Sequence, residues 1–486
     1  MISLFFIAML VAYIVIGTSI AMISRKFGVK TTADYFVAGY RLGGFLASMT
    51  YAATTYSAFM MVGLVGLAFV TGVASLGFEL SYLIATLGLL SLIGPMIWRK
   101  ARERKWVSPS EMISDLYGSP IVGITTAILY LIALIPYTSA QLKGVGEIFN
   151  SVGIGYEVGI IVGLALVLLW TLIAGMWSVA TTDAYQGLWM VSAAIVAIIW
   201  LSLRLIPSSG LSIDEIFRTL TNTKNGNLLG NTWSFSTFLG FTTPWLFFAL
   251  TNPQVVQRLY MPRNEKAYKR MIQYFALYGI LYTIIVVLIG LLFRAYTIQV
   301  LGNSIETILL KNRDAVTPYM LSLAHPLIAS FIYVSIVAAA ISTANSIVLS
   351  VSSSIARDLY ERRLRNPNPK VSIIISSLSI AIMTIIAAII AIIKPTFIVE
   401  LSVLSSAMLI PLAPVTIIGI LKTPGRKGVL PALCSIVLGF AIVFGTAIVY
   451  GAKKALVTTW AGIPVSMWSL IVSTLILATL FIRKTK

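Results

Sequence analysis

Long apolar segments recur along this 486-residue chain, and they limit its fold more than any other feature. Hydrophobic residues make up 58% of the sequence and charged residues only 10%, whereas soluble domains carry roughly 25% charged residues. A helix needs about 20 apolar residues to cross a bilayer core. We therefore predict an all-α integral membrane protein, one polytopic domain over residues 1–486, with about thirteen transmembrane helices. The predicted spans are residues 2–22, 43–70, 74–98, 119–147, 154–175, 178–205, 233–256, 270–293, 318–356, 370–393, 396–421, 428–451 and 464–482.

The basic residues of the chain are concentrated in particular loops. The net charge is +19, with 35 Lys and Arg against 16 Asp and Glu. With the N-terminus outside, most basic residues fall in the loops after odd-numbered spans and in the C-terminal tail, as the positive-inside rule requires of cytoplasmic segments. Arg258, after the seventh span, counts among these loop charges. We therefore predict a plasma-membrane protein with an outer N-terminus and a cytoplasmic C-terminus, and no nucleic-acid partner.

The residue types that most enzymes need are scarce. The chain has one cysteine, Cys434, and one histidine, His325, which excludes an intramolecular disulfide, a thiolate metal cluster and most histidine-based chemistry. The sequence patterns of P-loop ATPases, HExxH proteases and GxSxG hydrolases are missing as well. We expect no enzyme activity, no catalytic residue and no cofactor.

Polar side chains inside an apolar span are costly, so they usually face a cavity, a pathway or another helix. Span two can unwind at its polar residues, or its Thr and Ser side chains can bond back to carbonyls of an intact helix. Asp183, near the start of span six, is either a functional carboxylate or one satisfied by neighbouring hydroxyls. The polar segments are residues 50–57, 181–186, 242–244 and 342–354.

The ninth span carries a stripe of hydroxyl groups. At about 100° per residue, Ala339, Ser342, Thr343 and Ser346 share one helix face, and the serines at 352–354 extend it toward the predicted cytoplasmic end. Such a stripe is either a helix-packing face or one wall of an ion path.

Two interrupted helices would give that stripe a partner. We expect the helix of span seven to kink or open at Pro244, and spans two and seven are five apart, which suits transporters built from inverted repeats. Carbonyls freed at a break, together with hydroxyls, form a neutral cage for an alkali cation, whereas a dense carboxylate cage favours divalent ions. The residues alone indicate an ion-coupled carrier or an ion pathway.

Four stretches resemble motifs of the sodium:solute symporter family, and the resemblance covers nearly the whole chain. It implies a leucine-transporter-type core of two inverted five-helix repeats, residues 43–205 and 233–421. A peripheral helix at 2–22 precedes the core, and two peripheral helices within 428–482 follow it. The four stretches are ADYFVAGYRLGG (33–44), GMWSVATTDAYQG (175–187), AAAISTANS (338–346) and SSSIARDLY (352–360).

The resemblance also implies the ion ligands. In the sialic acid branch of the family a second sodium ion lies near the cytoplasmic side, and here Asn345 stands where those relatives have serine. Asp183 could instead line the sodium exit route. The predicted sodium ligands are the main-chain carbonyls of Ala53, Tyr56 and Ala339 and the hydroxyls of Ser342 and Thr343. The residues of the second site or exit route are Asp183, Ser342, Asn345 and Ser346.

The solute site implied by the resemblance is apolar. Thr55 stands where proline symporters have an aspartate, and Ala249 where they have a tyrosine, while Glu79 falls at a polar position shared with sugar symporters. The Glu-Gln pair of the sugar branch is replaced by SAFMM (57–61), and such a pocket would leave sugar hydroxyls unpaired. The predicted solute-binding residues are Thr55, Phe59, Tyr137, Gln141, Trp245 and Ser405.

The resemblance thus predicts a secondary active transporter with sodium as its coupling ion. It would import a small organic solute by alternating access, either an amino acid such as proline or a small monocarboxylate. Its partners would be sodium, the solute and the lipid bilayer. Two alternatives stay open: a proton-coupled carrier of the same fold, and a sodium-coupled sugar or vitamin symporter.

Overall fold

The computed structural model describes residues 2–28, 30–230, 232–394 and 396–482, and nearly all of them are helical. Nine helices in this part of the chain are long and apolar enough to cross a membrane. Two bent pairs pass the same test when each is taken as one span, with bends of 48° and 42°. The predicted spans 233–256 and 464–482 correspond to three short helices and one shorter apolar helix. The all-α class is confirmed, and the count of thirteen spans stays a prediction.

The spans fall into unbroken and broken helices, joined by short helices and turns. The unbroken helices are α1 (Ile2–Ser24), α5 (Ala74–Leu92), α8 (Pro120–Ser151), α9 (Tyr156–Ala174), α10 (Met176–Trp200), α16 (Glu265–Tyr296), α19 (Pro326–Ile355), α20 (Pro369–Ile393), α23 (Val429–Tyr450) and α25 (Val465–Ile482). The segments of the broken spans are α3 (Gly44–Thr55), the π-helical turn η3 (Phe59–Leu64), α4 (Val65–Thr71), α13 (Phe235–Leu246), α14 (Phe248–Thr251), α15 (Pro253–Arg258), α21 (Ile398–Leu409) and α22 (Leu412–Lys422).

Connecting elements lie at both ends of the bundle. The short helices are α2 (Thr32–Val37), α6 (Gly94–Arg104), α7 (Pro109–Tyr117), α11 (Ile206–Ser208), α12 (Ile213–Thr221), α17 (Asn303–Lys311), α18 (Val316–Ser322) and α24 (Ala452–Val457). The strands β1 (Thr459–Trp460) and β2 (Ile463–Pro464) pair antiparallel in a small hairpin. Proline occupies the first turn of α7, α8, α19 and α20, where its missing N–H costs no helical hydrogen bond.

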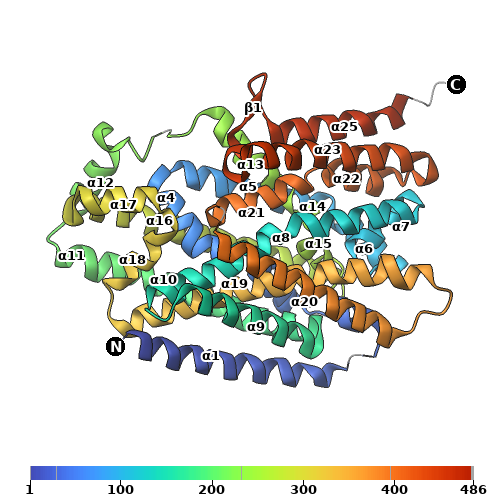
Figure 1. Cartoon of the computed structure of the whole chain (residues 1–486), viewed down its shortest axis with the longest axis horizontal. Helices are drawn as coiled ribbons and strands as arrows, with labels where there is room; N and C mark the ends of the chain where they lie inside the picture. The colour runs from blue at the N-terminus through green and yellow to red at the C-terminus, as the bar shows by residue number, and fades with distance from the viewer. Residues whose placement is uncertain (1, 29, 231, 395, 483–486) are drawn as a thin grey trace.

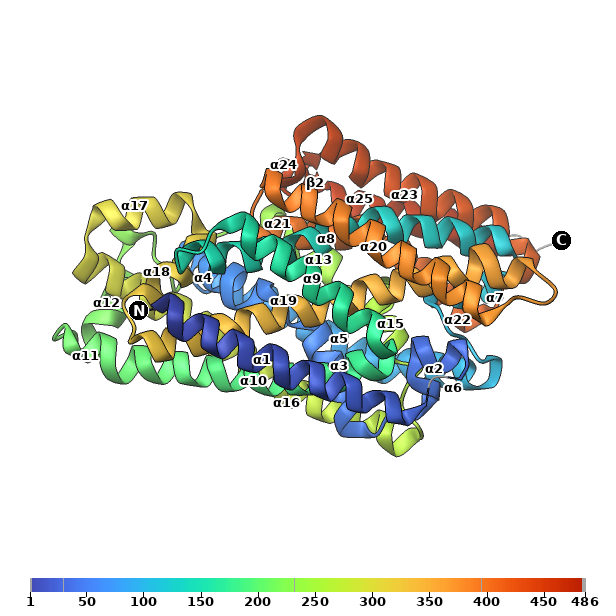
Figure 2. The same cartoon turned by 60° about the horizontal axis from the view of Figure 1, so that its bottom comes forward.

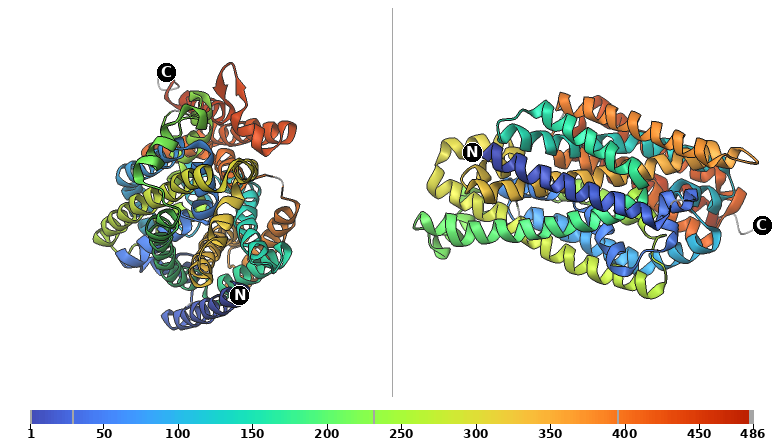
Figure 3. Two further views of the ribbon diagram at one scale, coloured as in Figure 1. Left: turned by 90° about the vertical axis from the view of Figure 1, so that its left-hand side faces the viewer. Right: turned by 90° about the horizontal axis from the view of Figure 1, so that it is seen from below.

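The helices run along one long axis, and the chain starts and finishes at opposite ends of it (Figures 1 and 3). Loops predicted to be cytoplasmic contact one another. The Leu42 amide donates to the Met261 carbonyl at 3.0 Å, and the Lys100 ammonium donates to the Ile420 carbonyl at 2.9 Å. At the other end, the Lys143 ammonium lies 2.6 Å from the Asp314 carboxylate. The first two contacts bring together chain segments after spans one and seven and near the ends of spans three and eleven, as the predicted topology requires. The full topology, and which end faces the cytoplasm, stay predictions.

Helix α19 lies in the interior, while α1, α23 and α25 lie at the edges of the bundle (Figures 1 and 2). Nearly all side chains of α19 from Ala329 to Ser354 are buried, and the helix packs against α1, α3, α8, α10, α15 and α20. Its position explains why small Ala and Ser residues dominate its middle, since they allow close helix approach. The division into two inverted repeats stays a prediction.

Two predicted boundaries are wrong. Span nine begins at Pro326, because residues 318–322 belong to the separate helix α18 and a turn follows it. Span seven does not end before Arg258. The segment α15 runs to Arg258, which is fully buried, so this residue is a charge inside the helix bundle and not an exposed loop charge.

Candidate ion and solute sites

The second span is broken near the end of its polar segment, residues 50–57. Helix α3 ends at Thr55, Tyr56 is extended at φ −88° and ψ 101°, and the chain resumes as η3 at Phe59. No proline or glycine causes the break. The Ala58 amide, freed from the helix, donates to Oε1 of Gln141 on α8 at 3.2 Å. Of the two interpretations of this segment, the unwound helix is the one that the structure adopts, and π-helical turns often mark functional sites.

A glycine on α16 leaves room for the side chain at the break. A Cβ atom added at Gly279 would lie 2.4 Å from the Tyr56 hydroxyl. The Tyr56 ring packs against Phe275 and Tyr278, with ring centroids 5.8 and 5.7 Å away. Glycine at position 279 therefore allows α16 to pack closely against Tyr56, the residue at which α3 unwinds.

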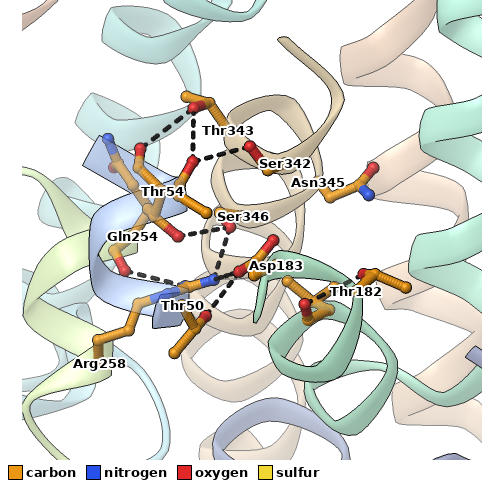
Figure 4. A network of polar contacts seen from close by, with 12 residues as sticks. Thr50, Thr54, Thr182, Asp183, Gln254, Arg258, Ser342, Thr343, Asn345 and Ser346 are labelled. Carbon is orange, nitrogen blue, oxygen red and sulfur yellow. Dashed lines mark hydrogen bonds and ion pairs between the residues drawn. The ribbon is translucent and has the colours of Figure 1, made fainter. Parts of the chain in front are cut away.

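Neutral oxygens of α3 and α19 meet beside the break, and we call this set the neutral station: Ala53, Thr54, Ala339, Ser342 and Thr343. The Ser342 hydroxyl lies 2.8 Å from the Ala53 carbonyl and 3.0 Å from the Ala339 carbonyl. The Thr343 hydroxyl lies 3.2 Å from the carbonyls of both Ala53 and Thr54 (Figure 4). All five residues are fully buried.

Four of the five predicted sodium ligands thus lie together. A hydroxyl has two lone pairs besides its one O–H donor, so rotation of the two hydroxyls would turn lone pairs toward a cation that the carbonyls also face. The fifth predicted ligand, the Tyr56 carbonyl, takes no part in these hydrogen bonds, although it follows the last turn of α3 directly.

A second set lies one helical turn closer to the predicted cytoplasmic end, and we call it the charged station: Thr50, Asp183, Arg258 and Ser346. The Thr50 hydroxyl donates to Asp183 Oδ2 at 2.6 Å. The Arg258 Nη2 lies 2.6 Å from Ser346 Oγ and 3.5 Å from Asp183 Oδ2 (Figure 4). All four residues are fully buried.

Thr54 joins the two stations. Its hydroxyl lies 2.8 Å from Ser346 Oγ, while its main-chain carbonyl accepts from Thr343. Helices α3, α10, α15 and α19 therefore contribute to one continuous polar seam.

Two members of the predicted second site do not meet Asp183. Asn345 accepts a hydrogen bond from Thr171 of α9 at 3.2 Å and lies apart from Ser346 and Arg258 (Figure 4). Ser342 belongs to the neutral station. Thr182, beside Asp183, bonds back to Ser178 of its own helix at 2.9 Å.

Arg258 is the functional candidate that sequence reasoning missed. A carboxylate inside the membrane requires a cation or several donors. The position of Asp183 within a predicted span therefore indicated that a basic partner should lie nearby. Position 258 lay two residues beyond the predicted span, so its charge was counted in the loop.

The hydroxyl stripe of α19 continues past the charged station toward the predicted cytoplasmic end, and there it is covered by neighbouring segments of the chain. Gln257 donates to the Val107 carbonyl and to Ser353 Oγ, both at 3.0 Å. Ser376 of α20 donates to Ser352 Oγ at 3.0 Å. Ser350 and the serines at 352–354 are all buried, so this part of the proposed path is packed in the present conformation.

The predicted solute residues surround the other side of the break. Phe59 and Trp245 stack with ring centroids 5.0 Å apart. Gln141 holds the unwound chain at Ala58, and its Nε2 donates to the Tyr137 carbonyl at 3.3 Å. Ser405 differs, because its hydroxyl bonds back to Leu401 of its own helix at 3.0 Å.

Several buried polar atoms here lack a protein partner within the described residues. They are Thr55 Oγ1, the Tyr137 hydroxyl and Trp245 Nε1. A buried polar atom without a partner is costly, so these three positions suit contact with a ligand. Glu79, also fully buried, has no hydrogen-bond partner in the described chain at either carboxyl oxygen.

The chain is similar to known transporters over most of its length. The family model described as "Sodium:solute symporter family" matches residues 35–439. The osmoregulated proline transporter OpuE of Bacillus subtilis (strain 168) is 25% identical over 374 residues, covering 74% of this chain and 73% of the relative. A sodium/proline symporter of Staphylococcus aureus (strain JH9) is 23% identical over 401 residues, covering 79% and 74%.

Solved structures show the same fold. A sodium-coupled sialic acid symporter, captured substrate-bound and outward-open with a novel sodium site, is 22% identical, covers 98% of both chains and has a TM-score of 0.78. Mhp1, a nucleobase-cation-symport-1 family transporter, is 12% identical and covers 94% and 95%, with a TM-score of 0.56. The predicted leucine-transporter-type fold is confirmed by these likenesses. Because the family model spans most of its length, the chain belongs to the sodium:solute symporter family.

Proposed function

We propose that this sodium-coupled symporter imports a small amino acid, with proline as the leading candidate. The observation that carries the proposal is the stacked pair of Phe59 and Trp245 beside the break in span two. Flat apolar rings next to a few polar atoms without partners suit a compact solute with one apolar face and one polar end. The relatives in Bacillus subtilis and Staphylococcus aureus are named as proline transporters, which supports the same choice.

The coupling ion would bind at the neutral station. Uncharged hard oxygens suit a monovalent cation, because a divalent ion is usually held by several carboxylates. The α3 carbonyls belong to the same broken helix that carries Phe59, so sodium binding would stabilise the solute-competent form of this segment. A coupling of about 1–3 kcal/mol between the two sites would raise solute affinity roughly 5- to 150-fold.

A proton-coupled carrier is the second candidate, and Glu79 favours it. This buried carboxyl group has no hydrogen-bond partner within the described residues and lies on α5 among aromatic side chains such as Phe78 and Tyr82. Such a group can exchange a proton with the solute path. The neutral station has no role in that mechanism, so replacing sodium separates the two candidates.

The test is uptake by purified protein in proteoliposomes. With an inward sodium gradient, we expect accumulation of radiolabelled proline, and much weaker uptake of lactate, galactose and sialic acid. Replacing external sodium by choline at fixed pH should abolish uptake.

Two variants test whether the solute binds beside Trp245. Trp245→Ala removes one of the two stacked rings and should raise the proline concentration for half-maximal uptake at least tenfold, which corresponds to a loss of about 1.4 kcal/mol of solute-binding free energy. Phe481→Ala, an exposed aromatic residue at the end of α25, is the matched control and should behave like the parent. Uptake that persists in choline would contradict sodium coupling, and sodium-dependent uptake of lactate alone would contradict the amino acid assignment.

A further inference from the structure

The charged station already contains a cation. The Arg258 Nη2 lies 2.6 Å from the Ser346 hydroxyl and 3.5 Å from the Asp183 carboxylate. These two groups are bonded in turn to the hydroxyls of Thr54 and Thr50. Such hard oxygens are what a bound alkali cation would use, and the carboxylate carries a full negative charge.

The chain holds the guanidinium in place by further contacts. Its Nη1 donates to the main-chain carbonyl of Gln254 at 2.9 Å, inside the last turn of α15. The C-terminal end of a helix favours a cation. Arg258 is fully buried, as is Asp183, and neither charge reaches water, so each depends on the other for compensation.

The guanidinium does not use all the oxygens of the station. Asp183 Oδ1 and Arg258 Nε have no hydrogen-bond partner within the described residues. The distance of 3.5 Å between Nη2 and Oδ2 is long for a charge-assisted hydrogen bond. The carboxylate would therefore have both oxygens available to another cation once the guanidinium is removed.

We propose that the Arg258 guanidinium is a built-in cation that occupies a cation site formed by Asp183, Thr50 and Ser346. The carrier then binds one sodium ion, at the neutral station, and none at the charged station. Removing the guanidinium exposes the carboxylate and the hydroxyls to the ion path and converts the charged station into a second sodium site.

Charge balance supports this assignment. One carboxylate and one guanidinium give a neutral group, whereas an added sodium ion would place two cations beside one carboxylate in a medium of low dielectric constant, where like charges repel strongly. The inference rests on the proposed sodium site at the neutral station, and it concerns how many ions bind, not which solute is carried.

The experiment counts sodium ions directly. Binding of ²²Na⁺ to the purified full-length protein, without solute, should saturate at one ion per wild-type chain. Arg258→Met keeps the length of the side chain without its charge, and it should bind two ions. Arg258→Met combined with Asp183→Asn removes the carboxylate as well and should return the count to one.

Matched variants separate the charge from other effects. Arg258→Lys keeps a cation and should bind one ion. Arg294→Met removes another buried, paired arginine, whose partner is Glu306 at 2.7 Å near the opposite end of the bundle, and it should also bind one ion. Folding of each variant is checked by size-exclusion chromatography in detergent.

Four outcomes overturn the proposal. A wild-type count of two would show that sodium displaces Arg258, and this result does not depend on whether any variant folds. A folded Arg258→Met protein that still binds one ion would show that the station is no cation site. A single wild-type ion that is lost in Asp183→Asn but kept in Ser342→Ala/Thr343→Ala would place sodium at the charged station.

A wild-type count of zero would overturn the sodium site of the proposed function together with this inference. Failure to transport proline would change neither the wild-type ion count nor the counts of the variants.

Discussion

The neutral and charged stations lie one turn apart on the same two helices, yet they offer a cation different kinds of groups. Helix α3 supplies the carbonyls of Ala53 and Thr54 to one station and the Thr50 hydroxyl to the other. Helix α19 supplies Ser342 and Thr343 to the first and Ser346 to the second. The neutral station has no formal charge, whereas the charged station has a buried carboxylate and a buried guanidinium.

The difference follows from where the backbone is broken. At the end of α3 the carbonyls lose their partners four residues ahead, because the chain unwinds at Tyr56 and each helix end leaves such groups unsatisfied. Those oxygens accept from the Ser342 and Thr343 hydroxyls instead, and these hydroxyls can rotate to admit an exchangeable ion. Around Thr50 the helix is intact, so its backbone oxygens stay within the helix. Only side chains are available there, and a charged side chain at this depth requires a fixed counter-charge.

The largest expected effect comes from breaking the charged station. Asp183→Asn leaves the Arg258 guanidinium buried without a negative partner, and loss of one member of a buried ion pair typically costs about 3–5 kcal/mol of the free energy of unfolding. We expect the apparent melting temperature in detergent to fall by several degrees or more.

A double-mutant cycle sharpens this prediction. Arg258→Met added to Asp183→Asn removes both charges, so it should recover most of the lost stability. Asp214→Asn, in the exposed pair with Arg218, is the matched control, and exposed pairs contribute only about 0–1 kcal/mol. Equal melting temperatures for Asp183→Asn and Asp214→Asn would show that the two buried charges do not stabilise each other.

The sequence predicted the neutral station better than the charged one, for a physical reason. Ser342 and Thr343 share a helix face that the 3.6-residue period defines, and the family motif supplies their partners on α3. Position 258 has no such local pattern. Its burial depends on how far α15 extends before the turn at residues 259–261, which is set by packing against α3, α7 and α19.

Asn345 illustrates the same limit. On a helical wheel it lies at the margin of the hydroxyl stripe, and its direction depends on which neighbour offers a partner. Thr171 of α9 does so, and α9 comes from a part of the chain whose position no local pattern reveals. The class of the fold and the faces of its helices were predictable, whereas contacts between distant segments required the structure.

The second largest effect is expected at the neutral station. Ser342→Ala with Thr343→Ala removes two hydroxyl ligands while the α3 carbonyls stay in place. A hydrogen bond or ligand contact to a charged group is worth about 1.5–3 kcal/mol, so the sodium concentration for half-maximal uptake should rise about 100-fold or more. Solute uptake measured against external sodium concentration gives this value.

The control for this double variant is a matched pair of hydroxyls elsewhere. Ser377→Ala with Thr384→Val removes two hydroxyls of α20 that bond only to carbonyls of their own helix. This pair should leave the sodium dependence as in the parent. If Ser342→Ala/Thr343→Ala responds to sodium like the α20 pair, the coupling ion does not bind at the neutral station.

The smallest effect is expected where the stations meet, at Thr54. Thr54→Val removes the hydroxyl that lies 2.8 Å from Ser346 Oγ but keeps the carbonyl that faces Thr343. Loss of one neutral hydrogen bond is worth about 0.5–1.5 kcal/mol, and here it falls on the charged station. If the stations act independently, the free energy of unfolding should drop by about that amount and the sodium concentration for half-maximal uptake should change less than about threefold.

A rise in that sodium concentration close to the one expected for Ser342→Ala/Thr343→Ala would mean that the ordering of Ser346 and Arg258 is transmitted through α19 to the sodium ligands one turn away. The built-in cation would then control sodium affinity as well as the number of ions bound.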